Sequence, residues 1–383
     1  MSQSPLSTTQ QITSEFHSPS IAERTAIFSG LFDTSRIWIF GCALFLIIYG
    51  SKRSLSVDSL FTDSKDEKNK EGKGSHTIEL SHAIFLPIGA SLSLLTMFLF
   101  FNVFQFFFFI STTVLSVLSF SFLLLQVCEK CFNFCNIDGN SKISSRCCND
   151  YTRNECLSLL VSTIIVSVWI FTGHWILMDA IGCALCVTML SYIRLPNLKV
   201  ATLLLVGLLV YDVFWVFLSE YIFNDNVMLR VATRPAYNPM NYVAKKLNIH
   251  EKVPVPKNLS LPGKLMFPSS RYPNRFGMLG LGDIVLPGLL ISFILRFEKS
   301  TTKLKSSQGA MTGYYNMSVI TYFIGLLIAT TMSEMFQAAQ PALLYLVPCI
   351  LIPLIIQAYR KGDLSAMWNY DAGENSKEEQ LIV

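Results

Sequence analysis

Long apolar stretches separated by shorter polar ones run along most of this 383-residue chain. A helix needs about 20 mostly apolar residues to cross the roughly 30 Å hydrocarbon core of a bilayer. Nine apolar segments are long enough for this, which predicts an all-α polytopic membrane protein with nine transmembrane helices. The predicted spans are 36–50, 84–102, 104–126, 157–173, 175–193, 199–219, 278–297, 317–334 and 341–359.

Composition agrees with this pattern and excludes a soluble globular protein. Hydrophobic residues make up 51% of the chain and charged residues 15%, against about 25% charged residues in soluble domains. The net charge of +4 does not indicate nucleic-acid binding, because the basic residues lie in the polar loops. We therefore expect the lipid bilayer as a partner and no nucleic acid.

The distribution of Lys and Arg predicts the orientation of the spans. Most of the 30 basic residues lie in or beside the segments on the same side as the C-terminus. Loops rich in Lys and Arg stay in the cytosol. The N-terminus is therefore predicted to be lumenal and the C-terminus cytosolic.

Two aspartates interrupt consecutive apolar spans: Asp212 in the sixth and Asp283 in the seventh. A charged side chain at the centre of a membrane helix costs about 2.5–3.5 kcal/mol, so it usually has a function. From the helical rise, each aspartate lies roughly 20 Å from the cytosolic end of its span. Because the two spans are antiparallel, we expect the two carboxyl groups to form a pair.

Paired carboxyl groups suit two different functions. Two neighbouring carboxyls tend to share one proton, so one can activate water while the other polarises a peptide carbonyl. The sequence does not say which aspartate would be the acid and which the base. The alternative is a polytopic transporter or cation channel that uses the acids as an ion site, but we find no inverted repeat or paired broken helices.

The aspartates belong to short motifs, and a third motif begins the last span. Tyr211 precedes Asp212, and the glycines at 280 and 282 precede Asp283, where they permit close backbone approach. Gln340, Pro341, Ala342 and Leu343 stand where a helix is predicted to start, a position that suits proline.

Together, Tyr211-Asp212, Gly280-Leu281-Gly282-Asp283 and Pro341-Ala342-Leu343 resemble the three motifs of the signal peptide peptidase family, which are intramembrane aspartyl proteases related to presenilin. The resemblance covers about residues 80–368 and points to the signal peptide peptidase-like 3 branch. It implies a presenilin-like bundle with Asp212 and Asp283 as the catalytic pair.

By the same resemblance, Tyr211, Gly280 and Gly282 form the environment of the active site. Gln340, Pro341, Ala342 and Leu343 position the substrate, as do Lys264 and Leu265 in the segment before the second catalytic helix. We predict that an unwound substrate pairs as a strand with 263–268 or with backbone near Pro341.

The resemblance also predicts the biological setting. It implies cleavage of type II membrane proteins within their membrane anchors, including Golgi glycosyltransferases whose ectodomains would be released. It implies localisation in the Golgi, the endoplasmic reticulum or both, with no cofactor, no metal and no obligatory accessory subunit. Whether the protein forms a homo-oligomer is left open.

These inferences divide the chain into four parts. They are a lumenal polar tail (1–35), scaffold helices one to five with a disordered loop at 51–80 (36–198), catalytic helices six to nine (199–360) and a cytosolic tail (361–383).

Three other features allow more than one interpretation. Five cysteines between Cys128 and Cys148 could bind zinc, although reduced or acylated thiols beside the membrane are favoured. For Asp179 in the fifth span, a helix-end or polar-network role is favoured over a catalytic one. Asn258 begins a glycosylation sequon on the predicted lumenal side and Asn316 one on the cytosolic side.

Overall fold

The fold is described from a computed structural model of the full chain. The structure describes residues 33–63, 76–78, 80–134, 142–145, 148–224, 226–233, 236–238, 256, 258–269, 276–304, 313–336 and 340–370.

Long helices dominate these residues and confirm the predicted all-α class. They are α2 (Thr34–Asp63), α3 (Leu80–Leu99), α4 (Phe101–Phe134), α5 (Arg153–Thr172), α6 (Trp175–Tyr192), α7 (Leu198–Val213), α11 (Gly282–Leu304), α12 (Tyr314–Phe336) and α13 (Leu343–Lys361). A π-helical turn (Phe214–Leu218) and the short helices α8 (Ser219–Phe223), α9 (Val227–Thr233) and α14 (Leu364–Trp368) complete the helical part.

Eight of the described helices are long and apolar enough to cross a membrane. The seventh predicted span is present as α11 but is not among the eight. Every 18-residue stretch of α11 contains Arg296, Glu298 and Lys299, which exceeds the two charges that such a span tolerates. The predicted count of nine is therefore not confirmed, although a multi-pass membrane protein is.

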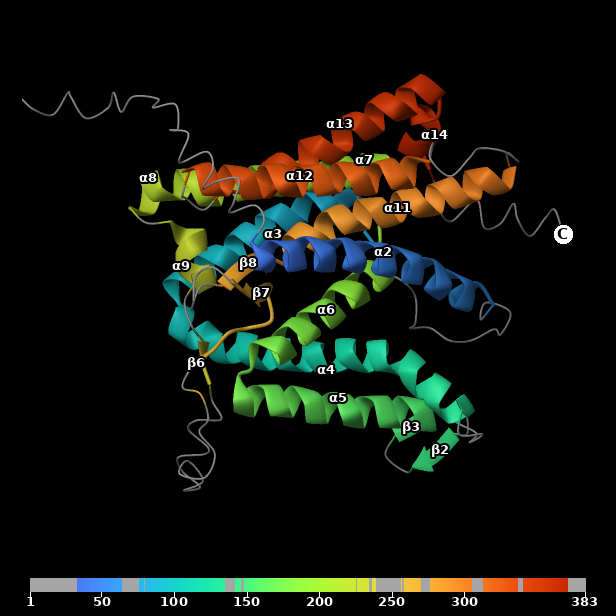
Figure 1. The fold of residues 1–383 in the computed structure, drawn as a ribbon, viewed down its shortest axis with the longest axis vertical. Helices are drawn as coiled ribbons and strands as arrows, with labels where there is room; N and C mark the ends of the chain where they lie inside the picture. The colour runs from blue at the N-terminus through green and yellow to red at the C-terminus, as the bar shows by residue number, and fades with distance from the viewer. Residues whose placement is uncertain are drawn as a thin grey trace, which may run out of the picture.

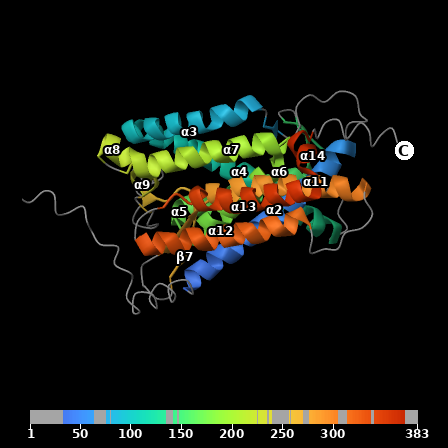
Figure 2. The ribbon, with the colours of Figure 1, turned by 90° about the horizontal axis from the view of Figure 1, so that it is seen from above.

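The helices pack in layers, with α7, α11, α12 and α13 above α2, and α4 and α5 at the opposite face (Figure 1). Turning the molecule shows α3 alongside α7 and α12 on the other side of α13 (Figure 2), and α3 contacts α7 and α12 contacts α13. The main hydrophobic core joins α2 and α6 to α7, α11, α12 and α13. The predicted scaffold and catalytic parts thus share one core.

The first helix is longer than predicted. The sequence predicts a disordered loop over 51–80, but α2 continues to Asp63. Its polar residues in this part find partners on neighbouring helices: Arg53 donates to the Gln126 side chain (2.8 Å) and to the carbonyl oxygen of Phe122 (2.8 Å). These contacts pair part of the buried Arg53 guanidinium and connect this part of α2 to α4.

Eight short strands form four two-stranded pairs within the described residues. They are β1 (His76–Thr77), β2 (Lys142–Ser145), β3 (Cys148–Thr152), β4 (Ile193–Arg194), β5 (Ala236–Tyr237), β6 (Asn258–Leu259), β7 (Lys264–Pro268) and β8 (Phe276–Gly280). The pairs are β1 with β4, β2 with β3, β5 with β6, and β7 with β8.

The β7–β8 hairpin corrects the predicted start of the seventh span. The sequence predicts a helix from residue 278, but 276–280 form β8, antiparallel to β7, and the helix begins at Gly282. Two glycines within five residues weaken the helix in this segment and permit the extended backbone. The hairpin lies at the same end of the bundle as α8 and α9, opposite α14 (Figure 1).

Candidate active site

Asp212 lies in the last turn of α7, just before the π-helical turn. Its side chain is buried, with 4% of its surface exposed. A hydrogen bond connects the π-helical turn to α3: the indole N–H of Trp215 donates to the hydroxyl of Ser91 (3.1 Å). Such turns often occur at functional sites, and this one follows directly on the aspartate.

Asp283 lies in the first turn of α11, where a negative charge is favourable at the positive end of the helix. The turn into the helix is short: Leu281 donates its N–H to the carbonyl oxygen of Gly263, and Val285 donates to that of Leu281 (2.9 Å). The side chain of Asp283 is partly exposed. Asp283 therefore follows the last strand of the β7–β8 hairpin after only two residues.

The two aspartates lie on neighbouring helices, and their action as a catalytic pair stays a prediction. Helices α7 and α11 are in contact, and the Asp283 carboxyl interacts electrostatically with that of Asp212. Asp212 is buried and Asp283 partly exposed, so their surroundings differ. This is an arrangement in which one proton can be shared between two acids.

The third motif is also at this site. The backbone N–H of Leu343, at the start of α13, donates to Oδ2 of Asp212 (3.3 Å). The first N–H groups of a helix lack partners within it, and Ala342, the residue before α13, has no side chain that could accept one. Pro341 is buried, and Gln340 accepts a hydrogen bond from the Tyr345 hydroxyl (3.3 Å).

The two motif glycines have different surroundings. A β-carbon added at Gly280 would lie 3.2 Å from Oδ2 of Asp283, tighter than ordinary contact. A β-carbon at Gly282 would meet nothing within 4 Å. Outside its own chain neighbours, Gly282 therefore has space for a side chain, whereas Gly280 lies close to the Asp283 carboxylate. Tyr211 is partly buried and packs against the main core.

Lys264 and Leu265 lie in β7, on the far side of the hairpin from Asp283. Lys264 pairs with Gly280 across the hairpin, and partial burial lowers the pKa of its ammonium group. Leu265 is fully buried in the main core. Lys264 therefore lies across the hairpin from Gly280, which is close to the Asp283 carboxylate. Leu265 instead packs β7 into the main core.

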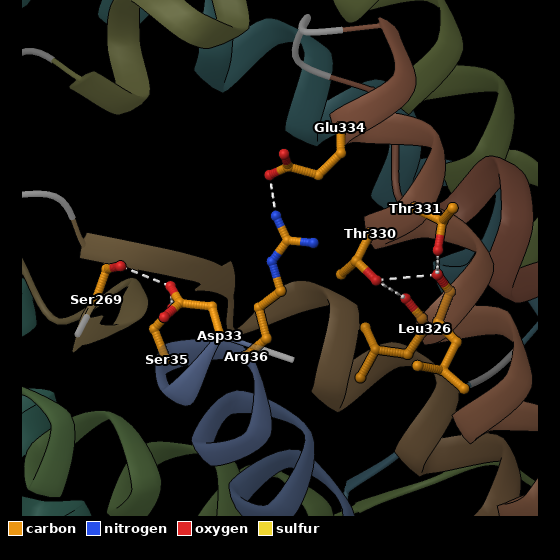
Figure 3. A network of polar contacts seen from close by, with 9 residues as sticks. Asp33, Ser35, Arg36, Ser269, Leu326, Thr330, Thr331 and Glu334 are labelled. Carbon is orange, nitrogen blue, oxygen red and sulfur yellow. Dashed lines mark hydrogen bonds and ion pairs between the residues drawn. The ribbon is translucent and has the colours of Figure 1, made fainter. Parts of the chain in front are cut away.

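Figure 3 shows how the end of this hairpin is held. Ser269, directly after β7, donates to Oδ2 of Asp33 (2.6 Å), which also accepts from Ser35 (2.9 Å). Arg36, one turn on in α2, forms an ion pair with Glu334 at the end of α12. The first and eighth predicted spans therefore meet beside the hairpin.

One neighbour of the site is not distinguishable in the sequence. The hydroxyl of Tyr322 in α12 donates to the backbone carbonyl oxygen of Asp283 (3.4 Å), and its side chain is fully buried. Tyr322 is one of 14 tyrosines and lies in no motif. Only the packing of α12 against α11 identifies it.

The cysteine cluster stays a prediction. Cys128 is buried and Cys131 exposed on α4, whereas Cys135 and Cys147 lie outside the described residues. No group of three or more metal-ligating side chains occurs in the part of the chain that the structure describes.

Comparison with known proteins identifies the class. The family described as signal peptide peptidase matches residues 70–374. "Signal peptide peptidase-like 1" of Arabidopsis thaliana is 36% identical over 82% of this chain and 87% of its own length. The protein of the same name from Oryza sativa is 35% identical over 79% and 85%, and "Intramembrane protease 2" of Caenorhabditis elegans is 34% identical over 60% and 46%.

The multi-pass fold and these relatives define an intramembrane aspartic peptidase. The chain belongs to the signal peptide peptidase family. Relatives named signal peptide peptidase-like 1, 2B and 3 all match it.

Proposed function

We propose that Asp212 and Asp283 are the catalytic pair and hydrolyse peptide bonds within the transmembrane segments of type II membrane proteins. The observation that carries this proposal is the meeting of all three motifs: Asp283 interacts with Asp212, and Asp212 in turn accepts the N–H of Leu343.

The chemistry needs one proton on the pair. The ionised carboxylate takes a proton from a bound water, and the oxygen of that water forms a bond to the peptide carbonyl carbon. The protonated carboxyl donates a hydrogen bond to the carbonyl oxygen. When the C–N bond breaks, the amine nitrogen takes a proton from the pair, which returns to its starting state.

The β7–β8 hairpin supports a proposal for where the substrate strand binds. Met266 donates its N–H to Asp179 rather than to β8. In an antiparallel pair the backbone groups point alternately toward and away from the partner strand. Its partner Met278 therefore also directs its backbone groups away from the hairpin, as does Gly280 two residues on.

This outer edge of β8 suits an unwound substrate. The β7–β8 sheet has no third strand among the described residues, and Met278 is 55% exposed. The edge leads directly to Asp283, whereas the outer edge of β7 is occupied at Met266 by Asp179. We therefore favour strand addition to 276–280 over the predicted pairing with 263–268 or with backbone near Pro341.

The substrate class and location rest on the resemblance to the signal peptide peptidase-like 3 branch. On that basis the substrates are type II proteins, including Golgi glycosyltransferases, in the Golgi, the endoplasmic reticulum or both. The N-terminus would be lumenal and the C-terminus cytosolic, in accordance with the basic loops. No accessory subunit would be required, and self-association is open.

A test uses the purified full-length chain in lipid vesicles with a type II membrane substrate. We expect cleavage within the anchor by the unmodified chain and none by Asp212→Asn or Asp283→Asn. Cleavage that survives either substitution would contradict the catalytic pair. Ion flux without cleavage would instead favour the transporter or channel.

A further inference from the structure

Asp179 is a buried acid that the proposed chemistry does not use. It lies in the second turn of α6 with 7% of its surface exposed. Its Oδ1 accepts the backbone N–H of Met266 (2.9 Å), and its Oδ2 has no hydrogen-bond partner among the described residues. Burying a carboxyl with one oxygen unpaired is costly, which raises the question of what role this position serves.

The hydrogen bond to Met266 uses a backbone group that the hairpin leaves free. Met266 pairs with Met278, and its N–H points away from β8. Asp179 thus occupies the outer edge of β7 without breaking the ladder between the strands. A side chain of α6 takes the place that a third strand would occupy on that side.

A second contact on the same face of α6 supports the first. Gly182 lies three residues after Asp179, so both face the same way. A β-carbon at Gly182 would lie 3.3 Å from Leu265 and 3.6 Å from Leu281. Helix α6 therefore contacts the hairpin at two points. Asp179 accepts a hydrogen bond from β7, and Gly182 lies close to Leu265 in β7 and to Leu281 directly after β8.

The hairpin is in turn coupled to the aspartate that follows it. Leu281 donates to Gly263, which closes the hairpin, and Asp283 comes two residues later. Gly280 lies against the Asp283 carboxylate. Any shift of β7 along α6 would therefore move the outer edge of β8, together with Asp283, relative to Asp212.

We infer that Asp179 is a positioning residue that selects which peptide bond of the substrate is cleaved. It fixes the hairpin on α6, and the hairpin presents the substrate strand to the two aspartates. This inference rests on the proposed function, because it takes Asp212 and Asp283 as the cleaving pair and β8 as the docking edge.

The test maps the cleavage sites by mass spectrometry of the products from one type II substrate. Asp179→Leu removes the acceptor at similar size, and Met266→Pro removes the donor N–H while leaving the ladder with β8 intact, which suits an outward-facing edge position. Asp179→Asn keeps an acceptor oxygen. The double variant Asp179→Leu/Met266→Pro shows whether the two changes act through one bond.

We expect the ratio of the main cut to neighbouring cuts to fall about five-fold in Asp179→Leu and in Met266→Pro, the population change that corresponds to one net hydrogen bond. The double variant should resemble the single ones, and Asp179→Asn should keep the original distribution. Thermal unfolding in detergent is measured for each variant.

Three results would overturn the inference: an unchanged distribution in both single variants, a distribution in Asp179→Asn as broad as in Asp179→Leu, or loss of the folded state in both single variants, which would make Asp179 a general structural residue. If one single variant fails to fold, the other decides. Failure of the proposed function is seen separately, as cleavage by Asp212→Asn or Asp283→Asn.

Discussion

Leu343 donates its backbone N–H to Oδ2 of Asp212 (3.3 Å), so the aspartate of the first motif caps the helix that begins at the third. The start of α13 would otherwise have an unsatisfied N–H group. The same carboxyl group therefore combines a structural contact with an electrostatic interaction with Asp283.

This double role separates two substitutions at Asp212. Asp212→Asn keeps an oxygen that can accept from Leu343, so we expect loss of cleavage with little change in thermal stability. Asp212→Ala should lose cleavage and also about 1 kcal/mol of stability, the usual cost of removing a helix cap. Cleavage assays and thermal unfolding in detergent measure both, and equal stability of the two variants would contradict the cap.

The outer edge of β8 gives a second prediction. Met278→Pro removes an N–H that points away from β7, so the hairpin keeps its ladder while the substrate strand loses a donor. We expect the rate of cleavage to fall about five-fold or more. Met278→Ala keeps the N–H and serves as the control; an equal loss in both variants would point to the side chain instead.

The two motif glycines should respond differently to alanine. In Gly280→Ala the new β-carbon would press on Oδ2 of Asp283, and a small displacement of a catalytic group can lower the rate about 100-fold. Gly282→Ala enters open space, and we expect an effect of less than about three-fold, typical of a substitution without a clash. Initial rates at saturating substrate compare them, and similar losses would contradict the steric explanation.

Tyr322 should affect the site without being essential. Tyr322→Phe removes the hydroxyl that donates to the backbone of Asp283, which should cost about 1 kcal/mol of stability and slow cleavage without abolishing it. Tyr345→Phe, which loses a hydrogen bond to Gln340, is the matched control away from Asp283. If Tyr322→Phe were as inactive as Asp283→Asn, Tyr322 would have a direct part in the chemistry.

Glycosylation tests the proposed orientation. Asn258 begins β6, at the end of the bundle with the β7–β8 hairpin (Figure 1). Asn316 is near the start of α12, two residues after Tyr314, whose hydroxyl donates a hydrogen bond to Asp363 at the opposite end of the bundle. We expect no glycan on Asn316, because that end faces the cytosol. A mass shift on endoglycosidase treatment that disappears in Asn316→Gln would contradict the proposed orientation and favour the opposite one.

Local patterns predict most of the helices but not all their ends. The break between the fourth and fifth spans follows from Gly173, which adopts a left-handed conformation (φ +61°) where glycine is favoured. By contrast, α2 passes beyond its apolar stretch, because Arg53 finds partners on α4. Such partners are distant in sequence, so no local pattern reveals them.

The sequence by itself determined the membrane class, the order of the apolar helices and the three motifs, because hydrophobic length and short motifs are local properties. Only the tertiary structure decided that α11 begins at Gly282 behind a hairpin, that Asp212 caps α13, and that Asp179 and Tyr322 hold the surroundings of Asp283. These are hydrogen bonds between backbone groups and side chains far apart along the chain, and they exist only once the helices are packed.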